Sequence, residues 1–181
     1  GYWGPNLVRN FADCKDAVVR MVCDSREERL AQAERRYPGI KTTTVPADLY
    51  NDPQVDAVVI ATPVETHFDL ALASLRAGKH VLVEKPITAS GDEASRLIDE
   101  AQARNLVLMV GHTFVYTGAV RKMKELSETG ELGEIYHFRG RYHQEWIMDP
   151  QFPKVWRLDK QVAGSGALGD IACHSVDLAR F

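Results

Sequence analysis

The chain has 181 residues, of which 22 are basic and 25 acidic, and the formal net charge of −3 leaves no basic excess. This balance argues against a role in binding nucleic acid or anionic membranes. Hydrophobic residues at 45% and charged residues at 26% are typical of a folded globular protein. No apolar stretch approaches the roughly 18 residues that span a membrane. The three cysteines, Cys14, Cys23 and Cys173, are odd in number and widely spaced, which argues against a disulfide framework and favours a reducing, cytoplasmic location.

The first two-thirds of the chain alternates short apolar runs with amphipathic segments. Two helix starts carry a capping box, in which Ser25 precedes Glu28 and Ser90 precedes Glu93. The nearly continuous apolar run over residues 55–61 is typical of a strand in a parallel sheet that is covered on both faces. The alternation predicts a doubly wound α/β (Rossmann) sheet. Strands are expected over residues 17–23, 41–45, 55–61, 80–84 and 106–111, and helices over 25–37, 65–77 and 90–104.

The pattern changes near Tyr116. A helix is expected over residues 119–128, and residues 135–143 then alternate, with Tyr136, Phe138 and Tyr142 on one side. Such alternation is typical of a one-sided strand in a mostly antiparallel sheet. We therefore expect a dinucleotide-binding domain over residues 1–117, without its first strand, and the start of a second, α+β domain over residues 118–181.

The beginning of the chain carries part of a dinucleotide-binding motif. Gly1 and Gly4 match the last two glycines of G-x-G-x-x-G, and the helix after Gly4 would present its N–H groups to a pyrophosphate. Asp24 ends the next expected strand, where a carboxylate accepts hydrogen bonds from the ribose hydroxyls. A carboxylate there repels a 2′-phosphate, so NAD is favoured over NADP, although the nearby Arg26 softens that preference.

Two further motifs follow expected strands, at the sheet edge where α/β proteins bind ligands. Ala61-Thr62-Pro63 follows one strand, and Glu84-Lys85-Pro86 follows the next. Because Pro86 restricts Lys85 to an extended conformation, we expect Lys85 to project into the crevice beside the nicotinamide. His67 lies one turn into the intervening helix, where packing or capping is the alternative to binding cofactor.

Asp170 and His174 are four residues apart, so a helix would place them on one face. Oxidation of an alcohol requires a base for the hydroxyl proton, and a histidine stabilised by a carboxylate suits that task near neutral pH. The glycines before them, Gly164, Gly166 and Gly169, would permit close contact with a ligand. The alternative is a capping aspartate beside a histidine that is satisfied in the core.

In this order, the motifs resemble the Gfo/Idh/MocA family of nicotinamide-dependent oxidoreductases, over essentially the whole chain. The resemblance implies a Rossmann domain followed by a substrate domain on a large, open, mostly antiparallel sheet, within a longer protein. Family members act mostly on sugars, sugar derivatives and cyclitols such as inositol. We therefore expect NAD as cofactor, a small polyol or sugar as substrate, and a homo-oligomer (dimer or tetramer) without nucleic-acid or membrane partners.

The resemblance also implies roles for individual residues. Lys85, Asp170 and His174 match the catalytic trio, in which His174 is the acid/base and Lys85 holds the reacting hydroxyl. Glu84 matches a residue that contacts the nicotinamide ribose, and Trp156-Arg157 resembles a pair that reaches over the cofactor in some members. No metal site is expected. The residues expected to bind cofactor are Gly1, Tyr2, Trp3, Gly4, Asp24, Arg26, Thr62, Pro63, His67, Glu84, Lys85, Trp156 and Arg157.

Two other functions remain open beside that of an NAD-dependent dehydrogenase. Some relatives use tightly held NAD for transient oxidation during glycoside cleavage. A regulator that binds nucleotide without catalysis could keep the same fold, since fold alone does not decide function. The presence of Lys85, Asp170 and His174 together argues against the regulator, because a sensor does not need all three.

Overall fold

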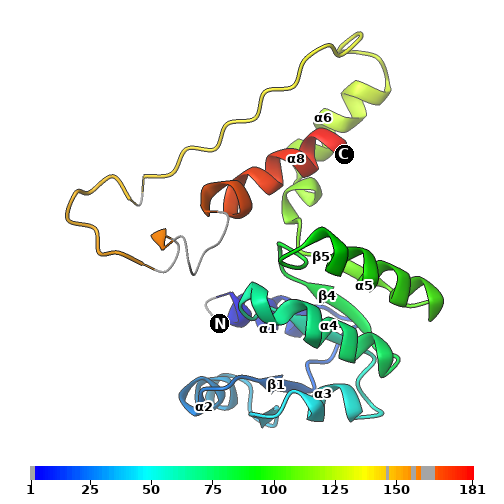
Figure 1. The fold of residues 1–181 in the computed structure, drawn as a ribbon, viewed down its shortest axis with the longest axis vertical. Coiled ribbons are helices and arrows are strands. Elements are labelled where there is room, and N and C mark those ends of the chain that lie inside the picture. The colour runs from blue at the N-terminus through cyan, green and yellow to red at the C-terminus, as the bar shows by residue number, and fades with distance from the viewer. Residues whose placement is uncertain (1–2, 146, 156–157, 160–165) are drawn as a thin grey trace. The chain divides into compact units, whose positions relative to one another are not determined.

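The computed structural model describes residues 3–145, 147–155, 158–159 and 166–181. The chain forms two compact units, Gly1–Gly111 and His112–Phe181. The elements of the first unit, blue to green in Figure 1, are α1 (Gly4–Ala12), β1 (Met21–Cys23), α2 (Glu27–Arg36), β2 (Lys41–Thr43), α3 (Ala47–Asn51), β3 (Ala57–Ile60), η1 (Val64–Thr66), α4 (His67–Arg76), β4 (His80–Val83), α5 (Gly91–Ala103) and β5 (Leu108–Val110). Those of the second unit are η2 (Thr113–Tyr116), α6 (Gly118–Glu128), the π-helical turn η4 (Leu168–Ala172) and α8 (Cys173–Arg180).

All described strands of the first unit pair in parallel, which confirms the predicted α/β fold. One sheet contains β1 and β2, and the other has the order β3-β4-β5. The two sheets share no ladder, because among the described residues no strand lies between β1 and β3 to join them. Strand β4 is central in the second sheet, so both of its edges are hydrogen-bonded.

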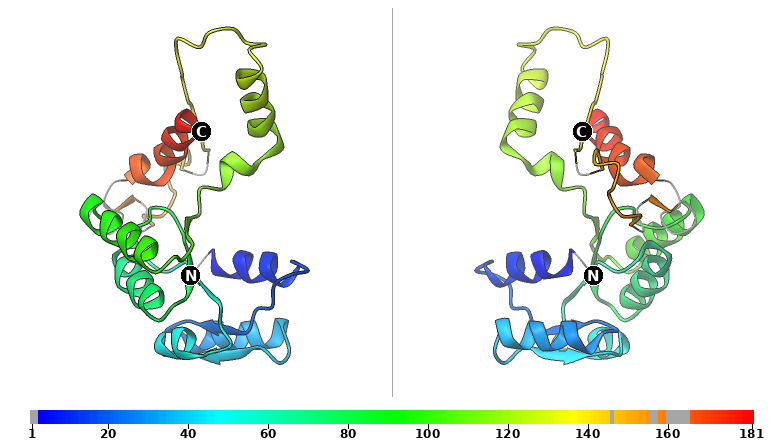
Figure 2. Two further views of the ribbon diagram at one scale, coloured as in Figure 1. Left: turned by 90° about the vertical axis from the view of Figure 1, so that its right-hand side faces the viewer. Right: turned by 90° about the vertical axis from the view of Figure 1, so that its left-hand side faces the viewer.

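The core of the first unit lies between the sheet β3-β4-β5 and the helices α4 and α5. Val81 and Val83 of β4 are buried against Leu75 of α4 and Leu97 of α5. Figure 2 shows these two helices side by side, and they are in contact. Burial of each such leucine stabilises the fold by about 1.5–3 kcal/mol. The other face of the sheet is less covered than the apolar runs predicted, since Leu82 is only half-buried.

The two predicted capping boxes have different outcomes. Helix α5 begins as predicted, with the Ser90 hydroxyl accepting the Glu93 N–H at 3.3 Å. The predicted Ser25 cap is wrong, because α2 begins at Glu27 and its N-cap residue, Arg26, makes no side-chain cap. The reason lies one residue earlier, where the carboxylate of Asp24 accepts the Arg26 N–H at 3.0 Å. This local bond holds the chain extended beyond Ser25 and delays the helix.

In the second unit, α6 confirms the predicted helix, but the predicted strand over residues 135–143 is wrong for the described residues. This segment, drawn in yellow in Figure 1, has no regular secondary structure. A strand requires a neighbour for its backbone hydrogen bonds, and the described part of this unit contains no other strand. As a result, the aromatic side of the segment is uncovered, and Tyr136 is 84% exposed.

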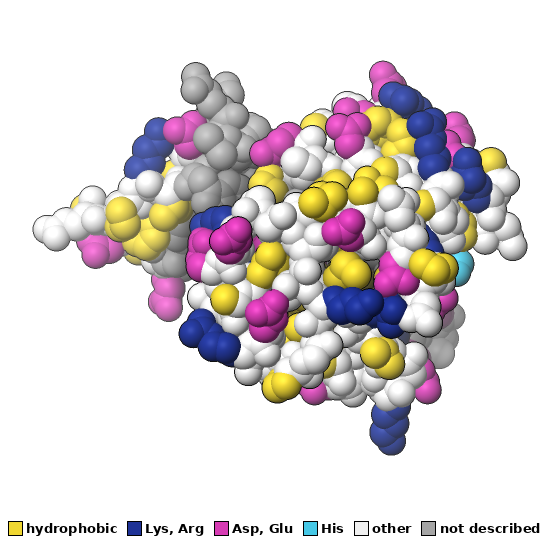
Figure 3. Space-filling model, turned by 90° about the horizontal axis from the view of Figure 1, so that it is seen from below, with side chains coloured by type: hydrophobic (Ala, Val, Ile, Leu, Met, Phe, Trp, Pro, Cys, Tyr) yellow, Lys and Arg dark blue, Asp and Glu magenta, His cyan; other side chains and the backbone are white. Residues whose placement is uncertain are grey.

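Charged side chains of both signs are interspersed on the face shown in Figure 3. This agrees with the near balance of basic and acidic residues in the sequence. Among the helices that the structure describes, none combines the length and the apolar character needed to cross a membrane.

Asp52, directly after α3, connects the two sheets of the first unit. Its carboxylate accepts a hydrogen bond from Arg20 Nε at 2.8 Å, and its backbone oxygen accepts one from Lys79 Nζ at 2.9 Å. Arg20 precedes β1 and Lys79 precedes β4, so one residue holds the starts of strands in both sheets. The hydrogen bond from Arg20, followed by that from the Gln54 N–H, lowers the pKa of Asp52.

Asp52→Asn should therefore lower the melting temperature of the whole protein at neutral pH. A carboxyl whose pKa is lowered by folding stabilises the protein above its ordinary pKa of 3.8, and this contribution disappears as the pH falls through the folded value. The difference between variant and wild type should thus shrink in acid, as measured by thermal unfolding across pH. Asp99→Asn, at an exposed position on α5, is the matched control. A difference that persists unchanged in acid would contradict the role of the charge.

Candidate functional site

The loops that carry the predicted motifs leave the same edge of the sheet β3-β4-β5. The ladder continues past the strand ends, since the Glu84 N–H donates to the Ile60 carbonyl at 2.9 Å and the Gly111 N–H donates to the Val83 carbonyl at 2.8 Å. The residues that follow the three strands are therefore held side by side. This edge is the place where a doubly wound sheet binds its ligand.

His67 joins two of these loops. It is the first residue of α4 and only 2% exposed. Its Nδ1 lies 2.8 Å from the carbonyl oxygen of Pro86, and its Nε2 lies 2.9 Å from the carbonyl oxygen of Thr62. Both ring nitrogens thus face the protein's own backbone. These contacts favour the packing role that the sequence left open.

Glu84 and Lys85 are both half-buried at the end of β4. The Lys85 N–H lies 3.3 Å from Glu84 Oε2, and the Lys85–Pro86 peptide bond is cis. The Glu84 carboxylate packs over Gly111, where an added Cβ would lie 3.0 Å from Oε2. The absence of a side chain at Gly111 is therefore what leaves room for the carboxylate. Gly111 was not among the predicted site residues, although a glycine directly after a strand at this edge is a signal for such close packing.

The N-terminus of α1 is the place where the sequence predicts that a pyrophosphate binds. The helix begins at Gly4, and no acidic side chain lies in its first turn. A Cβ on Gly4 would meet no atom within 4 Å, so the approach to the backbone is open. Pro5 has no N–H, and the N–H groups of Asn6 and Leu7 donate to the Trp3 carbonyl at 3.0 and 3.4 Å, so it is mainly the helix dipole that favours an anion at this position. Trp3 is the N-cap residue and is exposed.

Asp24 follows β1, and its carboxylate contacts both the backbone and a side chain at the start of α2. Oδ1 accepts the Arg26 N–H, and Arg29 Nη1 lies 3.2 Å from Oδ2. Arg29 was not predicted, and it contacts Asp24 where Arg26 was expected to act. The guanidinium of Arg26 lies 3.8 Å from Glu28 instead. Burial, followed by the charges of Asp24 and Asp48, raises the pKa of the neighbouring Cys23, which keeps that thiol neutral.

The predicted residues of the second unit lie on two adjoining elements. Asp170 belongs to the π-helical turn η4, and His174 lies in the first turn of α8 and is 8% exposed. π-Helical turns are rare and are frequent at functional sites. Gly1, Tyr2, Trp156 and Arg157, which were also predicted to bind cofactor, lie outside the described residues.

One cluster in the second unit has potential metal ligands. His112, Cys173 and His174 each place one donor atom so that all three lie within 4.8 Å of one another. Zinc favours imidazole and thiolate ligands. The Sγ of Cys173 also lies 3.7 Å from the carbonyl oxygen of Asp170, to which it donates. The prediction that the protein holds no metal stays a prediction.

Comparison with known families identifies the chain. Residues 1–112 match the model described as the oxidoreductase family with an NAD-binding Rossmann fold, and residues 120–181 match the GFO/IDH/MocA C-terminal domain. The chain belongs to the Gfo/Idh/MocA family. The predicted resemblance is confirmed, together with the Rossmann domain and its nicotinamide cofactor. The open first turn of α1 and the Asp24 carboxylate after β1 fit such a cofactor.

Its relatives include several sugar and cyclitol dehydrogenases. The chain is 40% identical to levoglucosan dehydrogenase from Pseudarthrobacter phenanthrenivorans, over 91% of this chain and 42% of that protein. It is 30% identical to myo-inositol 2-dehydrogenase from Thermotoga maritima, over 100% of this chain and 52% of that protein. A solved levoglucosan dehydrogenase in complex with NADH and levoglucosan matches with a TM-score of 0.83 and 40% identity, over 91% of this chain and 44% of that one. The chain thus spans about half the length of these relatives.

Gly111→Ala should weaken NAD binding by the whole protein. The new methyl group would displace the Glu84 carboxylate, and a lost hydrogen bond to a charged group costs about 1.5–3 kcal/mol, which corresponds to a roughly tenfold or larger rise in Kd. Calorimetric titration with NAD measures this change. Gly91→Ala is the matched control, because a Cβ there meets no atom within 4 Å. Equal NAD affinity in Gly111→Ala and wild type would refute the importance of the Glu84 position.

Proposed function

We propose that the whole protein is an NAD-dependent dehydrogenase that oxidises a secondary alcohol of a sugar or cyclitol. The observation that carries the proposal is Glu84-Lys85 at the carboxyl end of β4, the central strand of an NAD-binding Rossmann sheet. The similarity to a levoglucosan dehydrogenase and a myo-inositol 2-dehydrogenase supports the substrate class, since both names refer to cyclic compounds with several secondary hydroxyls.

The oxidation removes a hydride from the carbon and a proton from the hydroxyl oxygen. Bound NAD supplies the hydride acceptor, and the chain must supply the proton acceptor. His174 takes the proton, because imidazole exchanges protons near neutral pH. The Lys85 ammonium donates a hydrogen bond to the hydroxyl oxygen and stabilises the negative charge that develops there. Asp170 stabilises the charged form of His174.

Asp24 favours NAD over NADP. Its carboxylate accepts hydrogen bonds from the adenosine ribose, whereas the 2′-phosphate of NADP would bring a second negative charge against it. Arg29 neutralises part of this charge and holds the carboxylate in place, with Nη1 at 3.2 Å from Oδ2. The discrimination against NADP is therefore a balance between Asp24 and two arginines, the N-cap residue Arg26 and Arg29 in the first turn of α2.

Asp24→Ala should narrow the difference between the NAD and NADP dissociation constants by roughly tenfold, the equivalent of one hydrogen bond to a charged group. The same substitution removes the ion pair between Asp24 and Arg29, so that the Arg29 guanidinium can bind the 2′-phosphate of NADP. Titration of the whole protein with each cofactor measures the ratio, and Asp99→Ala, at an exposed acidic position on α5, is the control. A wild-type protein that binds NADP tighter than NAD would overturn the assignment.

Lys85→Ala and His174→Asn should each lower kcat by roughly 10²-fold or more, the range of acid–base catalysis. NADH formation with levoglucosan and with myo-inositol, followed by absorbance, measures turnover. NAD binding by His174→Asn should be close to that of wild type. Lys15→Ala, at an exposed position before β1, serves as control for loss of a positive charge.

The same assay separates the alternatives. A dehydrogenase releases one NADH per alcohol oxidised, whereas an NAD-dependent glycosidase regenerates its cofactor in each turnover and accumulates none. A regulator binds NAD but oxidises no polyol or sugar. Glycoside cleavage without NADH release, or NAD binding without turnover across a panel of polyols and sugars, would each refute the proposed dehydrogenase.

A further inference from the structure

The imidazole of His174 lies flat against the ring of Phe114. The two ring centroids are 4.1 Å apart and the ring planes differ by 10°, which is a parallel stack. Phe114 belongs to η2, and η2 packs against α8 within the second unit. His174 is one of the few buried polar residues in the described part of the chain. One face of its ring is therefore covered by an aromatic side chain.

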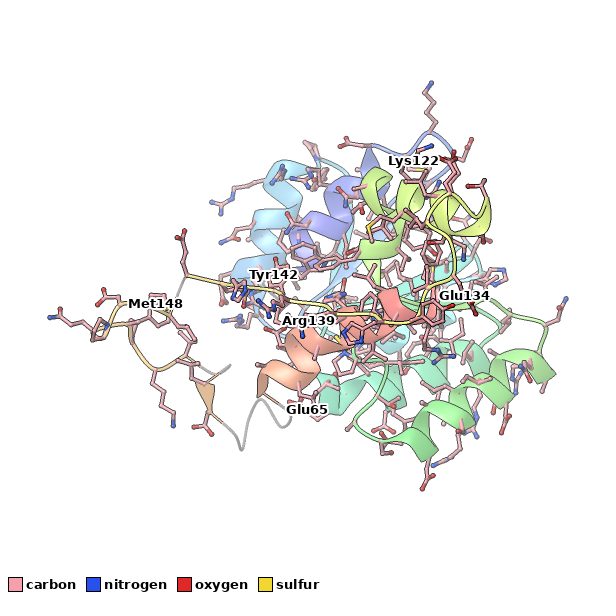
Figure 4. All side chains as sticks on the ribbon, turned by 90° about the horizontal axis from the view of Figure 1, so that it is seen from above. Glu65, Lys122, Glu134, Arg139, Tyr142 and Met148 are labelled. Atoms are coloured by element: carbon pink, nitrogen blue, oxygen red, sulfur yellow. The ribbon has the colours of Figure 1, made fainter. Side chains whose placement is uncertain are left out.

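Two more rings complete this arrangement. Tyr142, labelled in Figure 4 on the extended segment, stacks with Phe114 at 5.9 Å and 29°. His112, the residue before η2, meets His174 edge to face at 5.8 Å and 89°. Phe114 is thus in contact with two rings, and the His174 ring is in contact with both Phe114 and His112.

This contact bears on proton transfer because a histidine ring is not fixed by its own rotamer. The χ2 torsion of histidine joins an sp³ to an sp² carbon, and its energy wells are broad. Proton transfer requires the accepting nitrogen within hydrogen-bond reach of the hydroxyl and in line with it. A stacked ring restricts rotation about χ2, since turning the imidazole out of plane would drive it into the phenyl group.

We propose that Phe114 is a positioning residue that fixes the plane of the His174 imidazole for proton transfer. The inference rests on the proposed function for its catalytic part, and on the geometry of the second unit for the stack itself. Phe114 touches His174 and is not assigned a contact with substrate or cofactor. Tyr142 supports Phe114 by stacking with it. Substitution of Tyr142 should therefore lower kcat as well, but by less than substitution of Phe114.

The stack has a signature that does not depend on activity. In the whole protein labelled with ¹³C-histidine, the ring protons of His174, assigned by their loss in His174→Asn, should be shifted upfield by the ring current of Phe114. In Phe114→Leu they should move toward the positions of an exposed histidine such as His137. Phe181→Leu, which removes a phenyl ring that faces Lys124 Nζ at 4.0 Å in the same unit, should leave them unchanged. Unchanged His174 signals in Phe114→Leu would refute the stack.

Kinetics tests the catalytic part. Phe114→Leu and Phe114→Met should each lower kcat roughly tenfold, a part of the 10²–10⁴-fold that acid–base catalysis contributes. The KM for the alcohol and the Kd for NAD should change less than about twofold, as expected when only positioning is lost. Phe114→Tyr, which keeps the ring, should restore kcat, and Tyr142→Leu should have a smaller effect than Phe114→Leu.

Three outcomes would overturn the proposal. A raised KM with unchanged kcat in Phe114→Leu would make Phe114 a substrate contact. A lowered melting temperature with normal kcat in the folded fraction would make its role purely structural. A kcat that Phe114→Tyr fails to restore would exclude stacking as the cause. If wild-type protein oxidises no polyol or sugar, the proposed function and the catalytic part fall together, whereas the NMR shifts still decide whether Phe114 fixes the ring.

Discussion

The parallel pairing of β4 with β3 on one edge and β5 on the other determines where the candidate site can form. Ile60 pairs with Val83, and Val83 pairs with Val110, so the three strands end at the same level. The residues that follow them therefore leave the sheet together. A register shift of one residue would exchange the two faces of β4 and turn Val81 and Val83 away from α4 and α5. Burial of these valines thus fixes the register, and the register fixes the position of Glu84.

Several residues hold in place the loops and side chains that were predicted to bind the cofactor. His67 contacts the carbonyl groups of two loops, Gly111 provides space for a carboxylate, and Arg29 pairs with Asp24. Each acts by a different physical means, respectively a polar contact, the absence of a side chain and an ion pair. In a functional site the ligand-contacting groups are precise only when such supporting contacts restrict their rotamers.

The sequence predicted those features that depend on local spacing. The alternation of apolar runs gave the parallel α/β fold, and Ser90 with Glu93 gave the start of α5. The prediction failed at Ser25, because the Asp24 carboxylate accepts the Arg26 N–H and so keeps the chain extended where the helix was expected to begin. No spacing rule decides whether Asp24 or Ser25 organises this turn.

Features that depend on contacts between residues far apart in the chain could not be predicted from the sequence. The alternating pattern over residues 135–143 indicates a strand, but a strand also needs a neighbour, which the described residues of that unit do not supply. The contact of Phe114 with His174 joins residues 60 positions apart in the numbering, across α6 and the extended segment. His67 was recognised as a candidate, yet which carbonyl groups it faces depends on how two loops fold around it.

The position of His67 has a thermodynamic consequence. Because one buried ring contacts both the loop of Thr62 and the loop of Pro86, neither loop can shift without disturbing a contact to the other. Any molecule that orders the first loop then lowers the entropy cost of ordering the second, and the converse holds to the same extent. The affinity for a molecule at one loop is thereby linked to the affinity for a molecule at the other. Such cooperativity needs no domain movement, because the shared contact with His67 is enough to couple the two loops.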